Sequence, residues 1–135
     1  MDCILDAMTE NEISYAVRGI LLEIHQKYGP GLFESIYEKV LMVRLKQAGL
    51  KAQSQVAIYL NEPGLEDTVA FRIDILVENK VILELKCVEV LNKIHFTQIK
   101  SYLRLTGLKL GLLINFNSER ILEKPGFNRI VNGLS

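Results

Sequence analysis

Two carboxylates and a lysine in one short stretch could perform metal-dependent chemistry. Asp74 lies in an apolar run at residues 71–77, and Glu84 and Lys86 lie in a second run at 81–86. Two carboxylates held close together repel each other unless a proton or a cation lies between them. Mg²⁺ in proteins typically uses one or two carboxylates together with water and phosphate oxygens.

The pattern Asp…Glu-x-Lys is short and degenerate, however. Spacing alone therefore leaves a second interpretation open, in which these are solvated charges at a strand end with Lys86 as counter-ion.

The two runs are expected to be β-strands, because β-branched and aliphatic residues dominate both and a polar segment separates them. Residues opposite each other in an antiparallel pair share a face of the sheet. A two-residue turn at 79–80 would place Asp74 opposite Leu85 and mix the faces. A three-residue turn at 78–80 places Asp74 opposite Glu84, with Cβ atoms about 5 Å apart, and Asn79 tolerates the left-handed backbone of such a turn. We therefore expect the carboxylates to converge with Lys86 on the same face. The apolar odd-numbered positions should form one core face: Ile73, Ile75, Val77, Val81, Leu83 and Leu85.

Three helices are expected to surround these strands. A capping box formed by Thr9 and Glu12 predicts a helix over 10–27. A second helix is predicted over 32–48 and ends at Gly49. Glu34 falls in its first turn, where the helix dipole favours a carboxylate, and its apolar side is assigned to Ile36, Val40, Leu41, Val43 and Leu45.

The third helix is predicted over 93–106, with Asn92 as its cap and Gly107 at its end. At about 100° per residue, Gln98 and Tyr102 share a broad arc with the apolar residues of this helix. They are therefore expected to face the sheet. The opposite side carries the basic residues Lys93, Lys100 and Arg104, which are expected to face solvent.

Further strands complete a mixed sheet. Residues 53–60 alternate in polarity, so they should form an antiparallel meander with the two central strands. Residues 109–116 are almost continuously apolar, which is typical of a strand buried on both faces and parallel to a neighbour. Residues 127–131 are expected to form an edge strand. This order of elements predicts an α/β sandwich around a mixed sheet.

The chain as a whole fits one domain over residues 1–135. Sixteen basic residues balance sixteen acidic ones, which argues against non-specific nucleic-acid binding. No apolar run is long enough to cross a membrane and the first residues do not resemble a signal peptide, so a cytoplasmic location is expected. Cys3 and Cys87 lie far apart and His25 and His95 are isolated, which supports neither a disulfide nor a zinc site.

Three motifs carry a resemblance to a known family. The segment GLFESIY at 31–37 resembles the Gly-x-x-Glu-x-x-Tyr signature of the GxxExxY proteins, which belong to the PD-(D/E)XK nuclease superfamily. Asp74 with Glu84-Leu85-Lys86 is similar to the Asp…Glu-x-Lys signature of that superfamily. Gln98 and Tyr102 match the Gln-x-x-x-Tyr element of RecB-like nucleases, and the segment at 107–116 also looks like the family. The resemblance covers roughly residues 13–131.

The resemblance implies a restriction-endonuclease-like α/β/α sandwich and a metal-dependent nuclease. Asp74, Glu84 and the carbonyl of Leu85 would hold Mg²⁺ or Mn²⁺, and Lys86 would orient the attacking water or stabilise developing charge. Glu34 would act as an outer-shell or second-metal ligand, and Gln98 and Tyr102 would position the phosphate or the charged cluster.

The implied partner is nucleic acid, with DNA favoured, no membrane involved and a homo-oligomer left open. One alternative is a non-catalytic nucleic-acid- or protein-binding module that retains the nuclease fold. Another is a small structural subunit whose acidic pair binds metal for stability alone.

Overall fold

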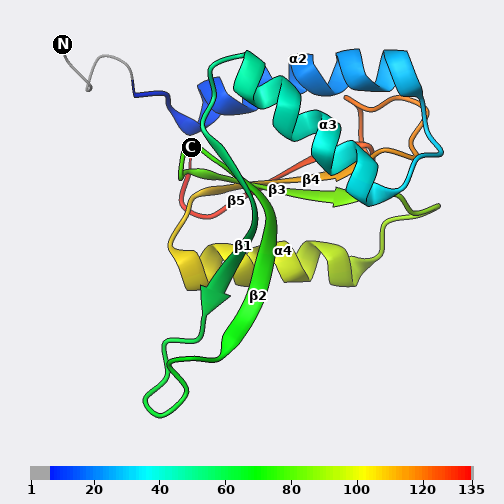
Figure 1. Cartoon of the computed structure of the whole chain (residues 1–135). Helices are drawn as coiled ribbons and strands as arrows, with labels where there is room; N and C mark the ends of the chain where they lie inside the picture. Colours follow the sequence, from blue (N-terminus) through cyan, green and yellow to red (C-terminus); the bar gives the residue numbers. More distant parts are fainter. Residues whose placement is uncertain (1–6, 135) are drawn as a thin grey trace.

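A computed structural model describes residues 7–134 and shows a five-stranded sheet between two layers of helices (Figure 1). Cys3 lies outside the described residues. The elements along the chain are α2 (Glu10–Tyr28), α3 (Glu34–Gln47), β1 (Ala52–Tyr59), β2 (Val69–Val77), β3 (Val81–Lys86), α4 (Lys93–Thr106), β4 (Leu110–Asn115) and β5 (Phe127–Val131). In the described part of the chain, none of the helices has the length and apolar character needed to cross a membrane.

The sheet has the strand order β1-β2-β3-β4-β5 and is mixed, as the sequence predicted. The strands β1, β2 and β3 form an antiparallel meander. The helix α4 then carries the chain over one face of the sheet, so that β4 runs parallel to β3, and β5 pairs with β4 in antiparallel fashion at the edge. All six residues of β4 are buried, which confirms the prediction of a strand covered on both faces.

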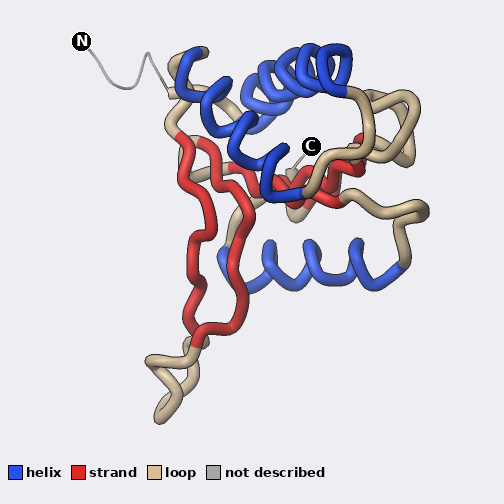
Figure 2. The backbone as a smooth tube through the Cα atoms, turned by 45° about the vertical axis from the view of Figure 1, so that its right-hand side comes forward, coloured by secondary structure: helices blue, strands red, loops and turns tan. Residues whose placement is uncertain are grey.

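Two hydrophobic cores lie on opposite faces of this sheet. Figure 2 shows α2 and α3 together on one face and α4 on the other. The core under α2 and α3 is the larger, and its strand residues include Ile75, Val77, Leu83 and Leu85. The core under α4 contains Ile73, Ile82, Ile99, Leu103, Leu113 and Ile130. The sandwich of α, β and α layers is the restriction-endonuclease-like arrangement that was expected.

One strand face does not follow the predicted alternation. Ile73 packs in the α4 core although Ile75, two residues later, packs under α2 and α3. The partner strand changes face at the same level, because Ala52 packs under α2 and α3 whereas Val56 packs on the α4 side. Gln55 lies at this level of β1 and has a φ of 53°, a left-handed conformation that interrupts a regular strand. Beyond this point β1 and β2 curve past α4 and project from the body of the molecule (Figure 1).

The helix ends follow their predicted signals, whereas one apolar face was predicted wrongly. The capping box of Thr9 and Glu12 is present, and Gly107 ends α4 in the left-handed conformation. In α3, however, the buried residues are Tyr37, Leu41 and Leu45. Ile36 and Val43 were expected in the core but are 39% and 55% exposed. The sheet contacts one row of residues at i, i+4 and i+8, and the second apolar row of the same helix faces outward.

The exposed glycine Gly19 provides a test of the packing around α2. An ideal Cβ at this position has no heavy atom of the described chain within 4 Å. Gly19→Ala should therefore raise the free energy of unfolding by about 0.5–1 kcal/mol, because alanine loses less backbone entropy on entering a helix. Urea unfolding followed by circular dichroism measures this change. The control Gly49→Ala should destabilise the protein, because Gly49 has a φ of 81°. A destabilised Gly19→Ala variant would contradict the described packing.

Candidate active site

The strands β2 and β3 separate at the two predicted carboxylates. Their pairing runs from Val77 opposite Val81 to Ile75 opposite Leu83. The turn between them comprises three residues, and its Glu78 and Asn79 have φ values of 53° and 54°. The predicted register is therefore confirmed, and it places Asp74 and Glu84 at the first level where the strands diverge.

Carboxylate oxygens take over the hydrogen bonding where the regular pairing ends. The backbone N–H of Asp74 donates to Oε1 of Glu84 at 3.2 Å. The backbone N–H of Leu85 donates to Oδ2 of Asp74 at 2.9 Å. Each carboxylate is thus fixed by the opposite strand, and the two acidic side chains are brought together as the register predicted.

The position of Glu84 is electrostatically unfavourable for its ionised form. Its side chain is only 6% exposed. The pKa of Glu84 is raised to about 8, first by burial and second by the neighbouring charge of Asp74. The charge of Lys86 opposes this shift. A proton or a cation at this place would relieve the repulsion between the two acids.

The helix α3 adds two carboxylates to the same surface. Oε2 of Glu34 accepts a hydrogen bond from the backbone N–H of Cys87 at 3.3 Å. Glu38, one turn later, accepts a hydrogen bond from Nε2 of Gln55 at 2.8 Å. Burial, and then the charges of Asp74 and Glu34, raise the pKa of Glu38, while its bond to Gln55 opposes this. These residues share a hollow of the surface lined by Glu34, Ser35, Glu38, Gln55, Asp74 and Leu85.

Sequence reasoning missed Glu38 and Gln55. Glu38 could have been found from its spacing, because a residue four positions after Glu34 lies on the same side of a helix. Gln55 carries no such local signal. Its place in the hollow depends on the pairing of β1 with β2 and on its left-handed backbone.

The position of Glu34 depends on a buried tyrosine. The hydroxyl of Tyr37 donates to the carbonyl of Gly29 and accepts from the backbone N–H of Leu32 at 3.3 Å. The Tyr37 ring stacks on Phe116, with ring centroids 4.0 Å apart. Gly31 has a φ of 117°, which suits glycine. The spacing Gly-x-x-Glu-x-x-Tyr therefore has a physical meaning here: the glycine allows the turn and the tyrosine fixes it to the core. As a result, α3 begins with Glu34 at the site.

The helix α4 brings Tyr102 to the acids but not Gln98. Tyr102 is half-buried and stacks on Phe71, with ring centroids 3.9 Å apart. Burial, and then the charges of Glu84 and Asp74, raise the pKa of Tyr102. The expectation that Gln98 faces the sheet is wrong, because its side chain is exposed and the buried stripe consists of Ile99 and Leu103. Lys93, Lys100 and Arg104 are exposed, as predicted.

The remaining candidate side chains have structural roles. Nε2 of His25 lies 2.8 Å from the carbonyl oxygen of Ser118, and Nδ1 of His95 accepts from the backbone N–H of Asn92. Cys87 packs against the larger core. Burial, with a smaller effect of Glu34, raises the pKa of the Cys87 thiol to about 11, so it is a poor nucleophile at neutral pH.

The donor set at Asp74 and Glu84 fits a hard divalent ion. Across residues 7–134, no three His, Cys, Asp or Glu side chains are grouped so that they could hold one metal ion. Mg²⁺ needs only one or two carboxylates, and its other ligands are water, carbonyl or phosphate oxygens. Two carboxylates, one of them disfavoured in its ionised form, and the backbone carbonyl of Leu85 meet that requirement.

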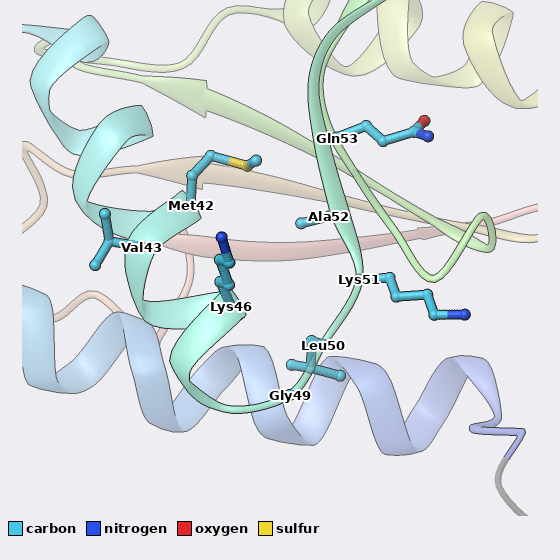
Figure 3. Close-up of a pocket in the computed structure, with 8 residues that line it drawn as sticks. All are labelled: Met42, Val43, Lys46, Gly49, Leu50, Lys51, Ala52 and Gln53. Atoms are coloured by element: carbon cyan, nitrogen blue, oxygen red, sulfur yellow. The ribbon is translucent and has the colours of Figure 1, made fainter.

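A second hollow, of about 720 Å³, lies at the other end of α3 (Figure 3). It is lined by Met42, Val43, Lys46, Gly49, Leu50, Lys51, Ala52 and Gln53. This lining contains no carboxylate, histidine or thiol, so it offers neither an acid–base pair nor a set of metal ligands. The carboxylate hollow is the better candidate for catalysis.

A family model described as PD-(D/E)XK nuclease superfamily matches residues 11–130, which include Asp74, Glu84 and Lys86. Neither the curated proteins nor the solved structures contain a match to this chain.

The raised pKa of Glu84 predicts a specific pH dependence of stability. The folded protein retains this proton up to a pH of about 8, whereas the ordinary pKa of the side chain is 4.5. The stability that the proton contributes is complete below 4.5 and is lost as the pH rises through 8. Glu84→Gln should therefore show a smaller loss of unfolding free energy over this range than the natural protein, as measured by urea unfolding.

Asp74→Asn provides the matched control for that measurement. It removes the neighbouring charge but leaves Glu84 buried, and the asparagine oxygen can still accept from Leu85. Its pH dependence should lie between those of the natural protein and Glu84→Gln. Parallel pH profiles for all three proteins would contradict the electrostatic account of Glu84.

Proposed function

Because the chain belongs to the PD-(D/E)XK nuclease superfamily, we propose that it is a metal-dependent nuclease that hydrolyses phosphodiester bonds in nucleic acid, with DNA as the favoured substrate. One observation carries the proposal. The carboxylates of Asp74 and Glu84 come together where β2 and β3 separate, and Lys86 follows two residues later on the same strand.

In this proposal Asp74, Glu84 and the Leu85 carbonyl hold Mg²⁺ or Mn²⁺. Such an ion, when bound, stabilises charge on the scissile phosphate and lowers the pKa of an attacking water. The electrostatics of the hollow support a metal requirement, because Glu34, Glu38 and Asp74 line it and would otherwise repel an anionic phosphate.

Lys86 is the side chain that we propose as the catalytic cation, in addition to the metal ion. It is half-buried at the end of β3, and its charge acts on Glu84. Its role would be to orient the attacking water or to stabilise negative charge as it develops on the phosphate. Glu34, held by the Cys87 amide, would orient water or serve a second ion.

The helix α4 would contribute from the other side of the sheet. Tyr102 is fixed by stacking on Phe71. Burial, and then the charges of Glu84 and Asp74, raise the pKa of its hydroxyl. Its proposed role is to position the charged cluster or a phosphate oxygen. Gln98 is exposed one turn earlier, and from there it would contact the nucleic-acid strand rather than the acids.

The direct test is a cleavage assay with Mg²⁺ or Mn²⁺ on single- and double-stranded DNA and RNA. The natural protein should cleave at least one of these substrates. Lys86→Ala should lose about 100-fold or more of that activity, as expected for loss of a group that stabilises transition-state charge. Lys46→Ala, in the second hollow, is the matched control and should keep the activity. Binding without cleavage under all of these conditions would instead favour a non-catalytic binding module.

Metal binding should also appear in the stability of the protein. At a hundredfold excess over its dissociation constant, a bound ion stabilises the folded state by about 2.7 kcal/mol. Asp74→Asn should be neutral or slightly stabilising without metal, because it reduces the repulsion at Glu84, yet it should lose the metal-dependent increase in melting temperature.

Thermal melts of both proteins, with and without Mn²⁺, measure this difference. Within the described residues the ion pairs are Arg44–Glu23 and Arg120–Glu123, and Lys86 is in neither. A natural protein that melts at the same temperature with and without Mn²⁺, together with a less stable Asp74→Asn variant, would refute the metal site.

A further inference from the structure

Phe33 is an aromatic side chain whose exposure the fold does not explain. It is 80% exposed and occupies the N-cap position of α3. Its side chain makes no capping hydrogen bond, whereas serine, threonine, aspartate and asparagine are the residues that stabilise this position. The backbone carbonyl of Phe33 accepts the first hydrogen bonds of α3, but its side chain contributes neither to the core nor to the capping of the helix. A role of this side chain in binding would explain its presence.

The ring lies next to the proposed nuclease site. Phe33 lines a hollow together with Gly31, Leu32, Glu34, Cys87 and Asn117. Glu34 also lines the adjoining hollow that contains Asp74 and Leu85. Cys87 directly follows the proposed catalytic Lys86 in the chain. A nucleic-acid strand with its phosphate at the carboxylates would therefore pass beside the Phe33 ring.

We propose that Phe33 stacks on an unpaired base of that strand, so that the site takes single-stranded or locally unpaired nucleic acid. This inference rests on the proposed nuclease function. Bases stack on exposed aromatic rings in proteins that bind single strands, and the contact tolerates any sequence. A base inside a duplex is already covered on both faces and offers no surface to the ring.

One further observation favours this substrate. The aromatic pair on the other side of the acids, Phe71 and Tyr102, is engaged in mutual stacking. Phe33, in contrast, presents an open face to a base.

A protein partner on α3 is the competing explanation. Ile36, Val40 and Val43 continue outward from Phe33 at helical spacing, and a partner helix could cover all four. Ile36 and Val43 are 39% and 55% exposed and Val40 is half-buried. Of the four residues, however, Phe33 is the one that lines the hollow of Glu34, next to the acids. The observations therefore favour a base, and a protein contact becomes an outcome of the test.

The absence of tryptophan from the chain allows a direct optical test. Phe33→Trp places a single indole at the ring position, and Lys86→Ala in the same protein prevents cleavage during the titration. With Mg²⁺ present, the fluorescence of this variant should be quenched by a short oligodeoxyadenylate. A strand of equal length with abasic sites, and a blunt duplex, should quench it much less.

Tyr15→Trp in the same background is the matched control. Tyr15 is also 80% exposed, but it lies on α2. The fluorescence of this control should not distinguish the base-bearing strand from the abasic strand or the duplex.

Affinity provides the second measurement. Phe33→Ala in the Lys86→Ala protein should weaken binding of the oligodeoxyadenylate about fivefold or more, which corresponds to the loss of one stacked base. Binding of the abasic strand should be unchanged by the same substitution, and Tyr15→Ala should bind both strands as the parent does. Thermal melts establish that both variants fold, as expected for residues so exposed.

The outcomes separate this inference from the proposed function. Equal quenching by the base-bearing and abasic strands, or unchanged affinity in Phe33→Ala, overturns the stacking role even when the natural protein cleaves. Base-dependent quenching in the Lys86→Ala background, together with a natural protein that cleaves none of the substrates, supports the stacking role and refutes the nuclease. Unchanged affinity together with loss of an oligomer in Phe33→Ala overturns the inference in favour of a protein contact on α3.

Discussion

The site depends on one constraint: two carboxylates are held together at the point where two strands of a single sheet separate. The backbone amides of Asp74 and Leu85 fix the acids in place, and the sheet carries Glu84 out of water. Neither acid can move away without breaking a hydrogen bond. Burial, and after it the charge of Asp74, therefore raises the pKa of Glu84. The two helical layers maintain this arrangement. They cover both faces of β3 and β4 and bring Glu34, Glu38 and Tyr102 to the same end of the sheet.

Much of this arrangement is predictable because it follows from local rules. The alternation of faces along a strand, with the length of the turn, is sufficient to place Asp74 opposite Glu84. Capping residues and glycines predict the helix ends because these signals act within one turn. The long apolar run of β4 predicts its burial. The family signatures lie on these predictable elements, which explains why the superfamily could be suspected from the sequence.

The errors have a common physical cause, because each depends on contacts between distant parts of the chain. Ile73 changes core where β1 and β2 twist away from β3, and the responsible backbone irregularity at Gln55 has no strong sequence signal. Two apolar rows of α3 were assigned to one core because helical spacing does not reveal which row meets the sheet. Gln98 was placed inside because the predicted apolar arc of α4 was wider than the stripe that the sheet covers.

The hydrogen bonds that fix the acids also connect occupancy of the site to the end of the sheet. The amides of Asp74 and Leu85 use as acceptors the same carboxylates that would take a cation. Each hydrogen bond uses one oxygen of its acceptor, Oε1 of Glu84 or Oδ2 of Asp74, and leaves the second oxygen of the same carboxylate for an ion. An ion in the proposed site would withdraw charge from both carboxylates and so weaken the two bonds that continue the pairing of β2 and β3. Hydrogen exchange at these two amides would then report whether the proposed site is filled.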